Sequence, residues 1–177
     1  YHKVKLVPFA EYVPLSEYLP SLNDLNFGQG NFTAGKEFTL FQFDNFLFSN
    51  LICYESSLPN IVRKFVLKGA EFINIQANDG WLGKTSGPYQ HFEIAKMRAI
   101  ENRRPIVRSA NTGISGIILP SGKILEKKTL GERSVFKGKF SLSNKITFYT
   151  KFGNILGKWI SLIFILSAGL ILWIKRL

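Results

Sequence analysis

The sequence has few acidic residues, two histidines and a single cysteine, Cys53. One cysteine excludes an intramolecular disulfide and any cysteine-rich zinc site. The chain also lacks internal repeats, low-complexity tracts, a cluster of metal-ligating residues and a phosphate-binding glycine loop. We therefore expect no metal and no cofactor in this protein.

The scarcity of acidic residues leaves a formal net charge of +11, which indicates an anionic partner. The basic residues are scattered and form no arginine-rich tract, so we do not expect nucleic acid to be that partner. A negatively charged membrane surface fits the charge better, because of how the chain ends.

Residues 159–174 carry no charge, and they are bounded by Lys158 on one side and by Lys175 and Arg176 on the other. Their length approaches the roughly 20 residues that a bilayer core requires. A buried core helix is the alternative, but a helix that is apolar on every face is hard to bury in a domain of this size. We expect a transmembrane helix over residues 155–175. The positive-inside tendency then puts its basic end in the cytoplasm and residues 1–150 on the other side of the membrane.

The rest of the chain alternates patterns typical of strands and helices. We expect strands over residues 36–44, 45–52, 72–76, 105–110, 113–120 and 134–140. Helical spacing predicts helices over residues 57–69 and 88–102, with loops over 21–35 and 77–87 and a hairpin turn at 121–122. This order favours a layered α/β domain.

Cys53 lies between an apolar run, residues 46–52, and the first predicted helix. A strand, a sharp turn, a nucleophile and a helix are how α/β enzymes present a reactive side chain at a sheet edge. A thiol there could attack an ester or amide carbonyl and hold the acyl group as a thioester. The alternative is that Cys53 packs as a small buried hydrophobe.

An active thiol needs a base for its proton and donors for the oxyanion. A lysine of the first segment, Lys3 or Lys5, could be one donor, and the backbone N–H of Tyr54 could be the second; without further context such lysines are solvated surface charges more often than site residues. Residues 78–81 are typical of a turn. We do not expect a Cys–His pair, because nothing in the pattern brings His91 to Cys53 or supplies a residue to orient its ring.

Several motifs follow one another in a specific order. They are Lys3 followed by Val-Pro-Phe-Ala-Glu-Tyr-Val-Pro at 7–14, Ile-Cys-Tyr-Glu at 52–55, Asn-Asp-Gly-Trp at 78–81, and the motifs at 87–91, 97–101, 104–105 and 111–115. In this order and spacing the chain resembles the apolipoprotein N-acyltransferases, which are membrane members of the nitrilase superfamily. The resemblance covers residues 1 to about 125, and a closing C-terminal membrane span is also typical of that family. Soluble nitrilases share the lysine and cysteine but not the proline-rich motif or the terminal span.

The resemblance implies an α/β fold, the nitrilase-like αββα sandwich, of which residues 1–150 would be the C-terminal part. It also implies a reaction at the periplasmic side of the bacterial inner membrane. An acyl chain passes from a phospholipid to the cysteine as a thioester, and then to the α-amine of the diacylglyceryl-cysteine of a maturing lipoprotein.

The resemblance also assigns roles to six residues. Cys53 matches the nucleophile and Lys3 the oxyanion-stabilising lysine of a Glu-Lys-Cys triad; Glu11 matches a supporting glutamate, Tyr54 and Glu55 the neighbours of the nucleophile, and Trp81 a loop beside the lipid-facing pocket.

This chain departs from the family in one small and one large respect. Ala10 stands where the family usually has glycine. The catalytic glutamate and the multi-helix membrane domain of the family belong upstream of Lys3. We therefore expect the chain to need a missing N-terminal half, to be inactive alone, and to expose a sheet edge in isolation. A nitrilase-like amidase acting on a small amide, and an inactive membrane-anchored fragment, are the alternatives.

Overall fold

The computed structural model describes residues 1–25 and 30–174, apart from the side chains of Leu170 and Leu172. Six strands form one sheet, β1 (Leu40–Phe43), β2 (Phe46–Ile52), β3 (Phe72–Asn78), β4 (Ile106–Asn111), β5 (Ser115–Ile118) and β6 (Ile124–Lys128). The α-helices are α1 (Pro59–Leu67), α2 (Gly87–Asn102), α3 (Phe148–Phe152) and α4 (Ile155–Ile174). Short 3₁₀ turns, η1 (Pro20–Leu25), η2 (Cys53–Ser57) and η3 (Gly80–Leu82), complete the elements of the described residues.

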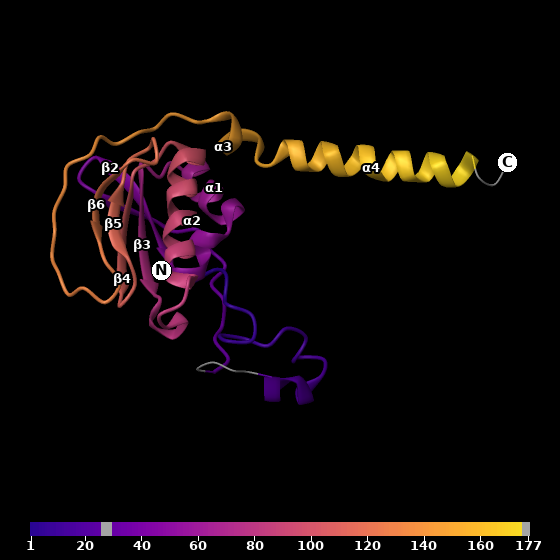
Figure 1. Ribbon diagram of the computed structural model, residues 1–177, viewed down its shortest axis with the longest axis horizontal. Helices are drawn as coiled ribbons and strands as arrows, with labels where there is room; N and C mark the ends of the chain where they lie inside the picture. The colour runs from indigo at the N-terminus through magenta and orange to yellow at the C-terminus, as the bar shows by residue number, and fades with distance from the viewer. Residues whose placement is uncertain (26–29, 175–177) are drawn as a thin grey trace.

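The strands lie in the sheet in chain order, and α1 and α2 cover one face of it (Figure 1). β2, β3 and β4 run parallel, whereas β1, β5 and β6 pair antiparallel with their neighbours. α1 links β2 to β3, and α2 links β3 to β4. The carboxyl ends of β2 and β3 therefore open at one edge of the sheet, where the turns η2 and η3 begin.

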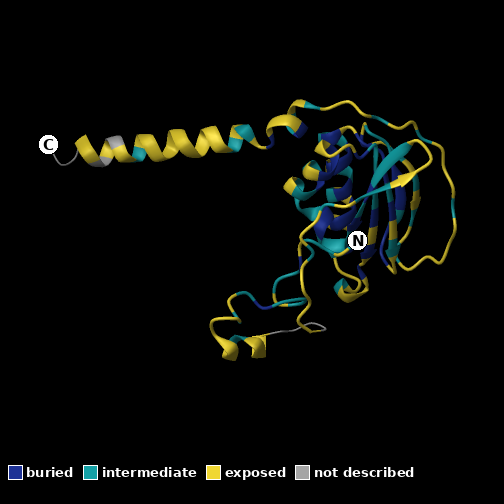
Figure 2. Ribbon diagram, turned by 180° about the vertical axis from the view of Figure 1, so that it is seen from behind, coloured by how far each residue is buried: buried dark blue, intermediate teal, exposed yellow. Residues whose placement is uncertain are grey.

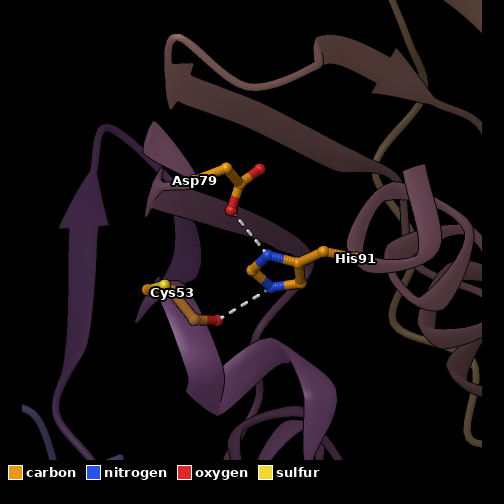
Figure 3. A group of neighbouring side chains, drawn as sticks. All are labelled: Cys53, Asp79 and His91. Atoms are coloured by element: carbon orange, nitrogen blue, oxygen red, sulfur yellow. Dashed lines mark hydrogen bonds and ion pairs between the residues drawn. The ribbon is translucent and has the colours of Figure 1, made fainter. Parts of the chain in front are cut away.

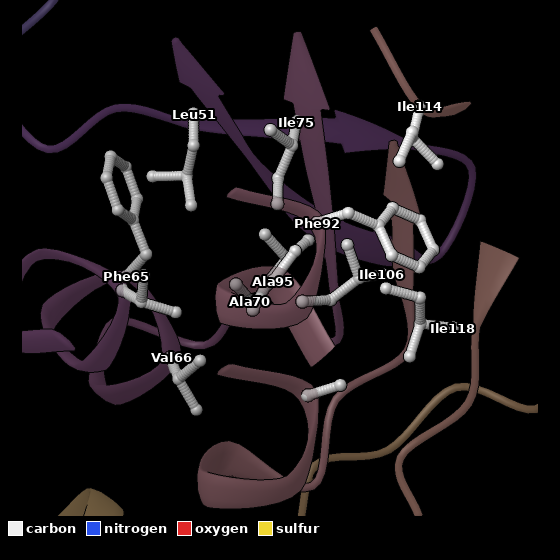
Figure 4. Packing of buried hydrophobic residues seen from close by; sticks show 13 residues of the cluster. Leu51, Phe65, Val66, Ala70, Ile75, Phe92, Ala95, Ile106, Ile114 and Ile118 are labelled. Atoms are coloured by element: carbon white, nitrogen blue, oxygen red, sulfur yellow. The ribbon is translucent and has the colours of Figure 1, made fainter. Parts of the chain in front are cut away.

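The hydrophobic core lies between the sheet and these two helices (Figure 4). Alternation along β3 turns Ile73 and Ile75 into the core, because successive side chains of a strand point to opposite faces. Phe65 of α1 and Phe92 of α2 are likewise buried against the sheet. This packing fixes the two helices over the strand ends that carry the candidate site.

The opposite face of the sheet is aromatic. Phe48 of β2 stacks on its register partner Phe72 of β3, with ring centroids 4.9 Å apart, and on Phe41 of β1 at 5.5 Å. Residues 129–147, which follow β6, run around the outside of the sheet to α3 (Figure 1). Phe140 of this segment contacts Phe72 at 5.8 Å. The buried Arg104 holds the end of the segment by donating to the carbonyl of Lys145 at 2.7 Å.

α4 extends away from the rest of the chain, and its described side chains are mostly exposed (Figure 2). The transmembrane helix expected over residues 155–175 is not confirmed. None of the helices formed by the described residues has the length and apolar character that crossing a membrane requires. Lys175 and Arg176, on which the predicted orientation depended, lie outside the described residues. The division into residues 1–150 and 155–175 stays a prediction.

Most elements were predicted correctly, but the strand expected over residues 134–140 is wrong. The turn at 121–122 leads directly into β6, which pairs with β5 and takes the edge position. Residues 134–140 form no strand, and Val135 is fully exposed. The first strand is also shorter than predicted, because only Leu40–Phe43 pair with β2. The predicted loop over residues 21–35 contains part of η1, and residues 26–29 lie outside the described part of the chain.

Candidate active site

Cys53 occupies a sharp turn at the carboxyl end of β2. It is the first residue of η2, is half-buried and has a positive φ of 51°. A residue with a side chain in this region costs about 1–3 kcal/mol, so the surrounding contacts must hold it there. Ser56 supplies one of them by donating its hydroxyl to the carbonyl of Cys53 at 2.7 Å. The strand, sharp turn and helix predicted around Cys53 from the sequence are thus present.

Glu55 is fully buried and ties the first segment of the chain to this turn. Its Oε1 accepts hydrogen bonds from the hydroxyl of Tyr1 at 2.7 Å and from the backbone N–H of Val4 at 2.7 Å. Its Oε2 accepts from the N–H of Ile52 at 2.8 Å. The carboxylate therefore joins the backbone next to Lys3 to the backbone of the residue that precedes Cys53.

Lys3 forms an ion pair with Glu11. Its Nζ lies 2.7 Å from Oε2 and 2.8 Å from Oε1 of Glu11, and the Lys3 side chain is only 9% exposed. The N–H of Val7 donates to the same carboxylate at 2.8 Å. The structure thus joins Lys3 to Glu11, and Glu55 docks their segment against the turn of Cys53.

His91 lies beside Cys53, contrary to our expectation (Figure 3). Its Nε2 is 3.2 Å from the carbonyl oxygen of Cys53 and 2.9 Å from Oγ of Ser56. Its Nδ1 is 2.8 Å from Oδ1 of Asp79, and Oδ2 of Asp79 accepts from Nη2 of Arg108 at 2.7 Å. Asp79 thus orients the ring of His91, contrary to the prediction that no residue does so, and the ring contacts the backbone of Cys53.

Electrostatics support an ionised Asp79. Burial alone raises the pKa of Asp79, but the hydrogen bond from His91 and the positive charge of Arg108 outweigh burial, and the pKa lies below its ordinary value. Burial lowers the pKa of Arg108, and its interactions with Asp79 and Cys53 oppose that shift. Burial and the hydrogen bond to Glu55 raise the pKa of Tyr1, so its hydroxyl stays a donor.

A cavity of about 210 Å³ lies beside Cys53. Cys53, Tyr54 and Trp81 line it, together with His91 of α2. Trp81 belongs to η3 and is 63% exposed, so its ring forms part of the cavity's outer rim. Three of the six predicted site residues therefore share one cavity, and Lys3, Glu11 and Glu55 form the hydrogen-bonded support described above.

Cys53, Asp79 and His91 also offer ligand atoms that all lie within 4.8 Å of one another. The oxygens of Asp79 are already bonded to His91 and to Arg108, whose positive charge would repel a cation. We therefore interpret these three residues as a hydrogen-bonded group and do not assign a metal ion to them.

Sequence reasoning missed Asp79, His91 and Arg108 as one group. Two signals could have found them. Asp79 directly follows the strand that lies parallel to the strand before Cys53, and the carboxyl ends of parallel strands meet. Arg108 interrupts a buried strand, where a charge requires a partner.

Comparison with known proteins agrees with this geometry. A family model described as carbon-nitrogen hydrolase matches residues 1–144. This chain belongs to the carbon-nitrogen hydrolase family.

The curated relatives carry a more specific name. An apolipoprotein N-acyltransferase from Chlorobaculum tepidum is 40% identical over 158 residues, which are 85% of this chain and 30% of that protein. The protein of the same name from Rickettsia prowazekii is 41% identical over 175 residues, 94% of this chain and 33% of that protein. These relatives confirm the resemblance to apolipoprotein N-acyltransferases. The chain spans about a third of the length of the relatives it matches.

Solved structures share the fold. Nit3 of Saccharomyces cerevisiae, a member of the nitrilase superfamily, matches 58% of this chain and 41% of its own, with 22% identity and a TM-score of 0.51. An amidase from Nesterenkonia sp. matches 73% of this chain and 45% of its own, with 21% identity and the same TM-score. The nitrilase-like α/β fold predicted from the sequence is therefore confirmed.

Proposed function

We propose that this chain carries the nucleophile, Cys53, of an apolipoprotein N-acyltransferase. Cys53 would take an acyl chain from a phospholipid and pass it to the α-amine of a diacylglyceryl-cysteine at the start of a lipoprotein. The observation that carries the proposal is Cys53 itself, which has a positive φ at the carboxyl end of β2 and lines a cavity. The names and identities of the curated relatives support it.

In the first half-reaction the thiolate of Cys53 attacks the ester carbonyl of the phospholipid. The ammonium of Lys3 and the backbone N–H of Tyr54 stabilise the oxyanion of the tetrahedral intermediate. The bond to the lysophospholipid oxygen then breaks, that oxygen takes a proton, and the acyl group stays on Cys53 as a thioester. In the second half-reaction the amine attacks the thioester, loses a proton and releases the thiolate.

The base that accepts the thiol proton belongs, in this proposal, to a further segment of a longer protein. The share of the relatives' length that this chain spans supports that assignment. The aromatic face around Phe48 and Phe72 supports it too, because a half-buried apolar face of a sheet is where a second layer packs. In this proposal an N-terminal half of the longer protein supplies both the base and the covering layer.

The substrates place the reaction at a membrane. We propose that α4 associates with lipid, since most of its large apolar side chains, including Trp159 and Trp173, are exposed. The location would be the bacterial inner membrane, with the catalytic part on its periplasmic side, as first expected from the resemblance.

Acyl transfer by the complete natural protein in phosphatidylethanolamine vesicles tests the proposal. The acceptor is a synthetic peptide that begins with diacylglyceryl-cysteine, and the readout is the mass of the peptide. We expect one added acyl chain with the unmodified protein and none with Cys53→Ala. Release of ammonia from a small amide without any acylated peptide would favour the amidase. Failure of both reactions in a folded complete protein would favour the inactive membrane-anchored form.

A further inference from the structure

The two ring nitrogens of His91 contact different groups. On one side its Nδ1 meets the carboxylate of Asp79, which is fixed in turn by Arg108. On the other side its Nε2 reaches Ser56 and the carbonyl of Cys53. His91, Asp79 and Arg108 are each at most 8% exposed. No step of the reaction proposed above uses them.

We propose that His91 is a positioning residue for Cys53, and that Asp79 and Arg108 contribute to the position of the nucleophile through the ring of His91. The inference deepens the proposed function, because it concerns the same nucleophile. Its geometric basis is the row of contacts from the guanidinium of Arg108 to the backbone of Cys53, in which each distance lies between 2.7 and 3.2 Å.

Nε2 of His91 contacts the backbone at Cys53, where the conformation is strained. Cys53 has a positive φ, and its carbonyl oxygen is bonded by Ser56 and approached by His91. Loss of these contacts lets the turn relax toward an ordinary backbone conformation, which moves Sγ relative to the cavity. A misplacement of about 1 Å near a reacting group can lower a rate about 100-fold.

The hydrogen bonds also argue against His91 as the base of the thiol. The ring nitrogen nearest Cys53 is already engaged by Ser56 and by the backbone carbonyl, and Sγ of Cys53 has its own contact with the carbonyl of Asn78 at 4.0 Å. His91 therefore acts on the position of the nucleophile and need not take its proton.

Two substitutions separate the two sides of the ring. The amide of His91→Gln falls near the place of Nε2 and can still contact Ser56 and Cys53. The shorter amide of His91→Asn falls near Nδ1, where it can reach Asp79 and Arg108 but neither Ser56 nor Cys53. The variants are similar in polarity, and Glu93→Gln, on the exposed side of α2, serves as a control for the helix. Thermal unfolding of every variant reports its stability.

The readout is the rate at which iodoacetamide alkylates Cys53 in the complete natural protein, followed by the mass of the Cys53 peptide. We expect His91→Asn to react about 10–100-fold more slowly than the unmodified protein, and His91→Gln at least about tenfold faster than His91→Asn. Asp79→Asn should slow the alkylation of Cys53 when His91 is present. In a protein that already carries His91→Gln, the same substitution should change the alkylation rate little. Glu93→Gln should react as the unmodified protein does.

Equal rates for the Gln and Asn variants would overturn the proposal, as would rates that only follow the unfolding temperatures. An Asp79→Asn effect that persists unchanged beside His91→Gln would show that Asp79 does not act through the ring. Alkylation needs neither phospholipid nor acceptor, so these results stand even if the acyltransferase assay fails. Conversely, if the protein transfers the acyl chain but the two His91 variants show the same alkylation rate, the proposed function stays intact and this inference is rejected.

Discussion

Replacing Glu55 by alanine tests whether one buried carboxylate holds the Lys3 segment against the turn at Cys53. Glu55 accepts three hydrogen bonds of 2.7–2.8 Å, from Tyr1, Val4 and Ile52, and a longer one of 3.3 Å from Lys5. A hydrogen bond to a charged group contributes about 1.5–3 kcal/mol, and donors that lose it partly regain water. We expect Glu55→Ala to lower the free energy of unfolding by about 3–5 kcal/mol.

Glu55→Gln is the matched variant, because its carbonyl oxygen can keep the three donors that meet Oε1 and loses only the bond from Ile52. It should cost about 1–3 kcal/mol. Unfolding by denaturant gives the two free energies of unfolding. Limited proteolysis reports whether residues 1–15 detach from the domain and become accessible to protease in Glu55→Ala. Equal stabilities for the two variants, or an alanine variant as stable and protease-resistant as the unmodified protein, would refute this reasoning.

Three further predictions concern the groups around Cys53. The lowered pKa of Asp79 means that its contribution to stability is present above its ordinary value of 3.8 and is lost as the pH falls below it. The stability difference between the unmodified protein and Asp79→Asn should therefore shrink between pH 7 and pH 3, and a difference independent of pH would contradict an ionised Asp79. Gly113→Ala should cost about 1–3 kcal/mol in thermal or denaturant unfolding, because the new Cβ would collide with Oδ2 of Asp79 and lie 2.8 Å from its Cβ. Glu11→Gln should slow thioester formation about tenfold with little loss of stability, since Lys3 loses the carboxylate that fixes its Nζ at 2.7 Å; a variant of unchanged rate would remove Glu11 from the site.

The sequence was sufficient for those features that depend on local pattern. Apolar runs identified the buried strands, and Pro88 at the start of a helical pattern located α2 within one residue. The turn at Cys53 was predictable because an apolar strand ends directly before it. The strand expected over residues 134–140 was wrong, because the free edge of β5 can pair with one segment only. The hairpin at 121–122 places β6 at that edge.

The contacts of His91 could not be predicted in the same way. They require the register that sets β2 beside β3, which brings Asp79 at the end of β3 close to Cys53 at the end of β2. They also require α2 to pack so that His91 faces that edge, although it is separated from Cys53 by 38 positions. The ion pair of Lys3 with Glu11 is closer in sequence, but it depends on the bend of the chain between them, where the N–H of Glu11 donates to the carbonyl of Val7 at 2.9 Å.

The most direct test of the account is the mass of the Cys53 peptide after the complete natural protein is incubated with phosphatidylethanolamine vesicles and no acceptor. With isotope-labelled acyl chains, we expect a labelled acyl group on Cys53 that hydroxylamine removes and that Cys53→Ala never acquires. An unmodified Cys53 in protein that is folded and membrane-bound, or a label on another residue, would contradict the assignment of Cys53 as the acyl-accepting nucleophile.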